Sequence, residues 1–281
     1  MLNQAKRFRS GLSRYALLTA GLLIAAAPAA FGQADGDLQI TVTNEGNSDF
    51  FLTPVWFGFH NGGFDLFNPG EAASASLEAL AEDGIVDGLV ADFTAAPGVP
   101  GDIQGVAANP AGFGGAPVID PGETATAFVT PINPAAYQYF TFASMVIPSN
   151  DTFIGNGNPF AYQVFNPAGE INDPSGVFTI EIFGSDLYDA GTEVNDSLGA
   201  AFSAAGGIAS DEFGTVQPLD GAELLNFFDG TTAAGTTITD FIGSGELLAT
   251  ITVSVVPEPS SAALIGLASA GLAFHRRRAS R

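Results

Sequence analysis

The chain has 281 residues, a formal net charge of −22 and no cysteine. All eight Lys and Arg residues lie within the first 14 or the last six positions, so residues 35–256 contain 29 of the 30 acids and neither Lys nor Arg. A domain without these cations cannot neutralise phosphates, which argues against nucleic-acid binding and against direct attraction to anionic membranes. The lack of cysteine excludes disulfides, thiolate metal sites and a cysteine nucleophile.

The first 34 residues have the three parts of a secretory signal. A basic stretch over residues 1–14 precedes an apolar run over residues 15–27, and Ala34 is a small residue suited to cleavage. The apolar run is shorter than the roughly 20 residues that a membrane-spanning helix needs. We therefore expect residues 1–34 to be a cleaved signal peptide. An uncleaved membrane anchor is the alternative.

Between the two ends, the pattern of apolar residues predicts strands. Apolar and polar residues alternate at 38–43, 178–182 and 247–255, as in half-buried strands. Residues 50–59 and 137–147 are more continuously apolar, as in central strands that are buried on both faces. Clusters of Gly, Pro, Asn and Asp predict two long loops, over residues 95–115 and 150–173.

Helical signals are scarce. Residues 71–83 form the best candidate, because Asn68 can cap the helix and Gly84 suits its exit. A second short helix is expected at 222–228. We therefore predict an all-β fold, an antiparallel β-sandwich with one or two short helices, in a single domain over residues 35–255.

The last 26 residues, 256–281, combine three signals in order. Pro257-Glu258-Pro259 is followed by an apolar stretch at 262–274 and by three arginines at 276–278. This order resembles the PEP-CTERM sorting signal of bacteria, which implies recognition and cleavage by an exosortase-type protease. It also implies a transmembrane sorting helix that inserts transiently, with the arginines on the cytoplasmic side. An ordinary tail anchor is the alternative, and both interpretations place the domain outside the cytoplasm.

Catalytic motifs are missing from the sequence. His60 is the only histidine between the two terminal signals, so a Ser-His-Asp triad would have to use it. No Gly-x-Ser-x-Gly elbow, His-Glu-x-x-His zinc motif or phosphate-binding Gly-Lys-Ser/Thr loop accompanies it. Because Asn61-Gly62-Gly63 follows, His60 is better explained as a turn or packing residue. Among so many acids, chance carboxylate pairs say little about glycoside hydrolysis. We expect no enzymatic activity.

A dense cluster of acids suggests a cation site. Five acids fall within 16 residues, namely Glu181, Asp186, Asp189, Glu193 and Asp196. Gly191 would allow the tight bend that brings Asp189 and Glu193 to one point. Asn150-Asp151 forms a second polar loop after an apolar strand, and calcium suits convergent oxygen ligands from two loops. The spacing is not that of an EF-hand. A solvated acidic loop is the alternative.

Three segments resemble, in order, a spondin N-terminal domain. The first, over residues 59–84, contains FHN, LFNPGEAA and LEALAEDG; the second, over 145–155, reads MVIPSNDTFIG; the third, over 186–193, reads DLYDAGTE. The match spans about residues 38–193. The resemblance implies an antiparallel β-sandwich with a calcium ion held by loops at one end, and it implies Asp151, Asp189 and Glu193 as ligands. Glu193 stands where the family more often has Asp, so the loop geometry must adjust.

The sequence departs from the animal family in two respects. Any family disulfide is missing, and residues 211–256 match no motif, although we expect them to supply the last strands. We expect a secreted, calcium-binding bacterial adhesion module, at the cell surface or in the extracellular matrix, with exopolysaccharide or matrix proteins as partners. The alternatives are an extracellular carboxylate-dependent hydrolase acting on exopolysaccharide and an acidic surface protein without a specific site.

Overall fold

The computed structural model describes residues 37–99, 103–109, 116–130, 133–204, 206–208, 210–219, 221, 230–233 and 235–256. The expected signal peptide, the sorting segment from Pro257 onward and the short helix expected at 222–228 lie outside these residues. Within the described part of the chain, no helix is long and apolar enough to cross a membrane.

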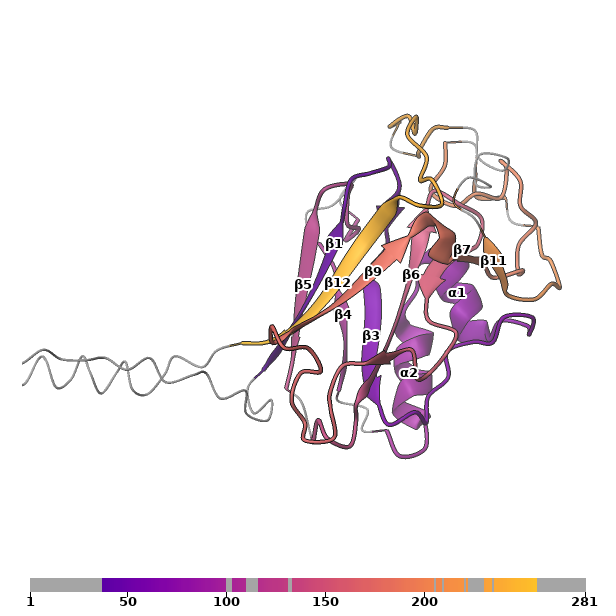
Figure 1. Cartoon of the computed structure of the whole chain (residues 1–281). Coiled ribbons are helices and arrows are strands. Elements are labelled where there is room, and N and C mark those ends of the chain that lie inside the picture. Colours follow the sequence, from indigo (N-terminus) through magenta and orange to yellow (C-terminus); the bar gives the residue numbers. More distant parts are fainter. Residues whose placement is uncertain are drawn as a thin grey trace, which may run out of the picture. The chain divides into compact units, whose positions relative to one another are not determined.

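The smaller of two antiparallel sheets has four strands (Figure 1). Their order is β5 (Thr124–Val129), β1 (Leu38–Asn44), β12 (Leu247–Val255) and β9 (Val177–Phe183). Buried and half-buried residues alternate along β1, so this sheet turns one face to the core and the other outward, as the alternating sequence predicted. β12 pairs with β1 over the whole length of β1, so the region without a recognised motif supplies a central strand.

The larger sheet is also antiparallel. Its main path is β11 (Gln217–Leu219), β10 (Leu187–Asp189), β7 (Thr152–Gly155), β6 (Tyr139–Ile147), β3 (Val55–His60) and β4 (Gln104–Ala107). Two short strands, β2 (Phe51–Leu52) and β8 (Tyr162–Gln163), pair with β6 as well.

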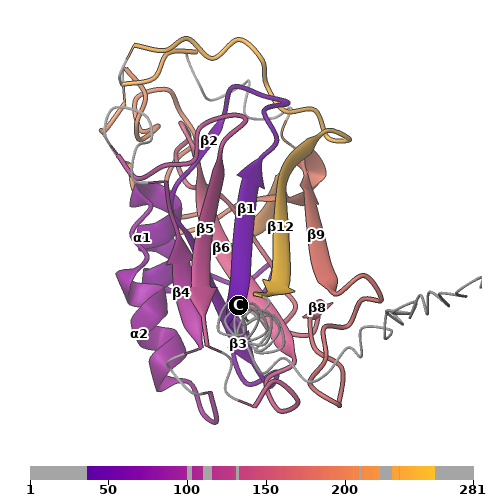
Figure 2. The ribbon, with the colours of Figure 1, turned by 90° about the vertical axis from the view of Figure 1, so that its left-hand side faces the viewer.

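Helices α1 (Ala75–Asp83) and α2 (Asp87–Ala95) pack against the larger sheet on the side away from the smaller sheet (Figure 1), and Figure 2 shows them at one side of the molecule, next to β4. The Trp56 ring of β3 packs edge-on against Phe93 of α2, with their centroids 5.5 Å apart. The larger sheet therefore lies between the helices and the smaller sheet, which explains why all of β3 and nearly all of β6 are buried. The predicted antiparallel β-sandwich is confirmed for the described residues, and so is the short helix that ends at Gly84.

Several boundaries differ from the prediction. Helix α1 begins at Ala75 and is capped by Ser74, whose hydroxyl accepts from Leu77 N–H at 3.2 Å, so the expected start at residue 71 with Asn68 as cap is wrong. Gly84 ends the helix with φ of 69°, as expected. Helix α2 was not predicted; it forms because Leu89 and Phe93 are buried against the sheet.

The strand pattern is also more broken than expected. The apolar run at 50–59 forms two strands, β2 and β3, because Pro54 lacks the N–H that a continuous ladder requires. The two segments expected as loops contain short strands: β4 lies within 95–115, and β7 and β8 lie within 150–173. These strands are too short for the apolar alternation to be visible.

Candidate functional site

Asp151 lies in the turn between β6 and β7, where its side chain is fully buried. Its Oδ2 atom accepts hydrogen bonds from the backbone N–H groups of Thr192 and Glu193, at 2.8 and 3.2 Å, and from the Thr192 hydroxyl at 3.2 Å. Its backbone carbonyl accepts from Ala190 N–H at 3.2 Å. The segment that follows β10 is therefore held against the turn that follows β6, so two of the polar loops singled out in the sequence meet.

Glu193 and Asn150 are buried beside Asp151, with 2% and 1% of their surfaces exposed. The Asn150 amide nitrogen donates to the Val194 carbonyl at 3.0 Å. Three oxygens of this group, Asp151 Oδ1, Glu193 Oε1 and Asn150 Oδ1, are buried and have no hydrogen-bond partner among the described residues. A buried carboxylate oxygen without a partner is costly, so these atoms need a cation, a water molecule or a proton.

Two glycines shape this group. Gly191 adopts φ of 67°, which provides the bend expected between Asp189 and Glu193. A β-carbon at Gly199 would collide with Glu193 Oε1 and with the Asn150 amide nitrogen. The lack of a side chain at Gly199 therefore leaves room for the unpartnered Glu193 oxygen.

Asp189 is the last residue of β10, and it pairs with Thr152, the neighbour of Asp151. Its Oδ1 accepts from Gly191 N–H at 2.7 Å, and its Oδ2 accepts from the Asn195 side-chain amide. Both oxygens are thus engaged within their own loop. The structure brings Asp151 and Glu193 into one hydrogen-bonded group and places Asp189 beside it.

Burial and like charges raise the pKa values of the two buried acids. Burial raises the pKa of Asp151 to about 6, with a further contribution from the Asp189 charge, although the hydrogen bonds from Thr192 and Glu193 oppose the rise. Burial also raises the pKa of Glu193 to about 7; the charges of Glu82, Asp151 and Asp196 add to the effect, and a hydrogen bond from the Asn150 side chain opposes it. Both carboxylates are therefore costly to ionise unless a positive charge is close.

Glu82 of α1 belongs to this electrostatic group but was missed by the sequence analysis. Burial raises its pKa, and the charges of Glu78, Asp83 and Asp211 raise it further, while a hydrogen bond from Thr192 lowers it. Residues 210–212 also approach, since Val194 N–H donates to the Ser210 carbonyl at 2.8 Å. No spacing rule could have indicated either contact, because both partners are distant from Asp151 in sequence.

The unpartnered atoms fit a hard cation in their chemistry. They are two carboxylate oxygens and one amide oxygen, which are the types that calcium prefers. Among the described residues, however, no three His, Asp or Glu side chains are grouped closely enough to hold a metal by themselves. A calcium ion here would thus be held by Asp151 and Glu193 with the Asn150 amide oxygen, and its remaining ligands would be backbone carbonyls or water.

His60 has a different environment. It is fully buried, its ring lies near those of Phe64 and Tyr139, and its Nδ1 accepts from Gly62 N–H at 3.0 Å. Burial lowers its pKa to about 4, so the ring is neutral at pH 7. These contacts are those of a turn and packing residue.

The C-terminal segment of the chain matches a known protein-family motif. Residues 255–278 match the PEP-CTERM protein-sorting motif, a range that includes Pro257, Glu258 and Pro259. A comparison with curated proteins finds no match. PEP-CTERM signals are recognised by exosortase, so the chain is a secreted protein that is sorted to the cell surface or the extracellular space.

Proposed function

We propose that this protein is a non-catalytic, spondin-type module that binds calcium and acts in adhesion or assembly of an extracellular matrix. In this proposal residues 1–34 export the chain, residues 35–255 form the functional domain and residues 256–281 are removed by an exosortase. The observation that carries the calcium assignment is the set of three unpartnered buried oxygens on Asn150, Asp151 and Glu193.

Charge supports the same proposal. The segment 35–256 has 29 acids and no Lys or Arg, so no side chain of that segment other than a protonated histidine can supply the missing positive charge. A divalent cation would neutralise Asp151 and Glu193 and would remove the cost of ionising them. Since the ion would bind the folded chain and not the unfolded one, it would stabilise the fold by about 2.7 kcal/mol at 100 times its Kd.

A thermal-unfolding experiment tests the proposal. The chain from residue 35 to 255 is melted in calcium, in chelator, and in sodium chloride of matched ionic strength. We expect a calcium-specific rise in Tm of about 5–11 °C at 100 times the Kd, because 1 kcal/mol corresponds to about 2–4 °C in a domain of this size.

Variants locate the effect. Asp151→Asn and Glu193→Gln should remove the calcium-specific rise, and Asp189→Asn should weaken it through the neighbouring loop. Asp92→Asn, at an exposed position of α2, makes the same change of charge and should keep the full rise. Equal melting of the wild type in calcium and in matched sodium would reject the calcium site and leave an acidic, solvated surface.

A further inference from the structure

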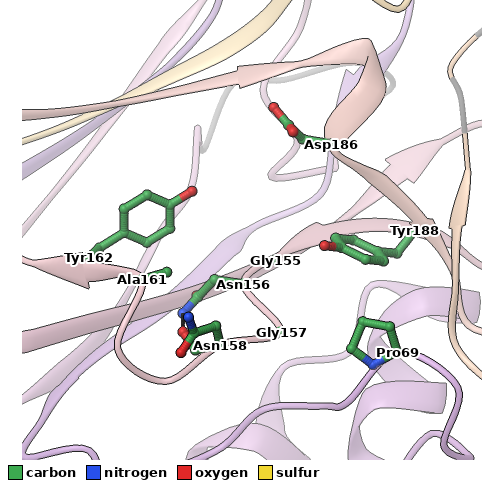
Figure 3. Close-up of a pocket in the computed structure, with 9 residues that line it drawn as sticks. All are labelled: Pro69, Gly155, Asn156, Gly157, Asn158, Ala161, Tyr162, Asp186 and Tyr188. Carbon is green, nitrogen blue, oxygen red and sulfur yellow. Dashed lines mark hydrogen bonds between the residues drawn. The ribbon is translucent and has the colours of Figure 1, made fainter.

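A second site lies on the edge of the larger sheet. A pocket of about 310 Å³ opens between the turn that follows β7, strand β8 and the start of β10 (Figure 3). Tyr162 of β8 and Tyr188 of β10 contribute their side chains from opposite sides, and Asp186 contributes its carboxylate from the 3-10 turn Gly184–Asp186. None of these residues belongs to the group around Asp151.

The aromatic walls of the pocket are held by packing. The Tyr188 ring stacks on Phe153 at a centroid distance of 5.7 Å and meets the edge of Phe67 at 4.8 Å. The Tyr162 ring lies 5.9 Å from that of Phe142. Such packing fixes both phenol groups before a ligand arrives, which reduces the entropy cost of binding.

The floor of the pocket is held by hydrogen bonds, and those of Asn156 are buried. Asn156 Oδ1 accepts from the Thr141 hydroxyl at 2.9 Å and from Phe142 N–H at 3.1 Å. Asn158 Oδ1 accepts from Phe160 N–H at 2.9 Å, which leaves its amide nitrogen available. The turn over 155–158 is therefore a rigid surface that carries one open donor.

Several polar atoms that face the pocket form no hydrogen bond with the described residues. The hydroxyl groups of Tyr162 and Tyr188 point toward the space between the two rings (Figure 3), and no hydrogen bond joins either to another described residue. Asp186 uses Oδ2 to accept from Phe183 N–H at 2.8 Å, and its Oδ1 has no such partner in the described part of the chain. The Asp186 charge adds to burial in raising the pKa of both tyrosines, so both hydroxyls keep their protons at neutral pH.

This combination selects a class of ligand. Two phenol hydroxyls and an amide nitrogen donate, a carboxylate accepts, and Pro69 and Ala161 add apolar surface. Together they match the hydroxyl groups and C–H faces of a sugar ring, and the volume is at the small end of ligand pockets. An anionic ligand would face Asp186 without a compensating cation. A cationic side chain would pair with the Asp186 carboxylate but would leave the two phenol donors without acceptors, so a lysine analogue serves as a competitor in the test below.

We propose that the pocket between Tyr162, Asp186, Tyr188 and Asn158 binds one unit of a neutral polysaccharide. This inference rests on the proposed matrix function, and it identifies the partner of the protein as a neutral polysaccharide. The carboxylate accepts from sugar hydroxyls, the two phenols and the Asn158 amide donate to sugar oxygens, and the apolar wall receives a C–H face.

Native affinity electrophoresis tests the inference on the exported protein. The gels contain dextran, pullulan, galactomannan or xyloglucan as neutral probes, and polygalacturonate as an anionic comparison. We expect at least one neutral polysaccharide to retard the protein and polygalacturonate to leave it unaffected. The double substitution Tyr162→Phe and Tyr188→Phe, and separately Asp186→Asn, should weaken the retardation at least about tenfold.

Matched variants separate pocket effects from general ones. Tyr137→Phe removes a hydroxyl group and Asp173→Asn removes a charge, both outside the pocket. Each control variant should be retarded by the neutral polysaccharide as strongly as the wild type is. Unchanged melting temperatures of the pocket variants would show that they fold. No retardation by any neutral probe, equal retardation of wild type and pocket variants, or displacement by Nα-acetyl-lysine amide would overturn the inference.

The calcium proposal and the sugar-binding proposal can be refuted independently, because different variants test them. If the pocket variants lose sugar binding but keep the calcium-specific rise in Tm, the result supports the sugar pocket and leaves the calcium proposal unaffected. Asp151→Asn tests calcium without altering any residue that lines the pocket.

Discussion

In calcium-free solution, the buried acids should make the stability of the protein fall as the pH rises. Burial raises the pKa of Asp151 from 3.8 to about 6 and that of Glu193 from 4.5 to about 7. An acid whose pKa is higher in the folded state than in the unfolded state favours folding at low pH. That stability is complete below the unfolded pKa and is lost as the pH rises through the folded pKa. The window is therefore about pH 4 to 7.

The magnitude follows from the pKa of Asp151. A rise from 3.8 to about 6 corresponds to about 3 kcal/mol of unfolding free energy. For a domain of this size, that predicts a Tm about 6–12 °C lower above pH 7 than below pH 4, from this residue alone. His60 acts in the opposite direction. Because its pKa is lowered to about 4, its stabilising contribution is complete above pH 6.5 and is lost as the pH falls through about 4.

The assay compares variants so that His60 and the general charge of the domain cancel. Tm is measured by circular dichroism from pH 4 to pH 8 in chelator, at an ionic strength of about 0.15 M. The Tm of Asp151→Asn should decrease less with rising pH than that of the wild type, whereas the Tm of Asp92→Asn should decrease as much as the wild type's. In the presence of calcium, most of this decrease in the Tm of the wild type with rising pH should disappear. If Asp151→Asn and wild type have the same dependence on pH in chelator, the buried carboxylate is not the cause and the reasoning is refuted.

Three further predictions concern packing and turns. Phe93→Ala should lower the unfolding free energy by about 3–5 kcal/mol in urea titrations, since it removes a buried ring from Trp56; a loss below 1 kcal/mol would contradict the helix packing. Asn156→Ala should cost about 1–3 kcal/mol in the same titration, because the Thr141 hydroxyl and a backbone N–H lose their acceptor, and an unchanged midpoint would contradict this role. Gly191→Ala should lower Tm by several degrees, because φ is 67° and the new β-carbon would lie 2.7 Å from Thr215 backbone atoms; a stable variant would contradict the bend.

The sandwich could be predicted because its half-buried strands alternate visibly. β1 and β12 each turn one face to the core, so their sequences carry a period of two. Helix α2 could not be predicted from such a pattern. Its sequence begins with Asp-Gly and includes β-branched residues, and the helix forms because Leu89 and Phe93 are buried against the sheet.

The candidate site could be predicted only in part. Asp189 and Glu193 stand out in a dense acidic cluster and Asp151 in a polar loop after an apolar strand, but only the resemblance to a known family separated these three from the other acids. The roles of Glu82 and Gly199 depend on contacts between segments that are distant in the chain, which no spacing reveals. The unpartnered oxygens are likewise a property of three-dimensional packing.

Direct calcium binding is the measurement closest to the central claim. Isothermal titration of calcium into metal-free protein over residues 35–255 should show one ion bound per chain. Glu193→Gln should abolish that binding, since it removes one of the two buried charges, while Asp92→Asn should leave stoichiometry and affinity unchanged. Absence of saturable binding by the wild type, or the same binding isotherm for Glu193→Gln, would contradict the account.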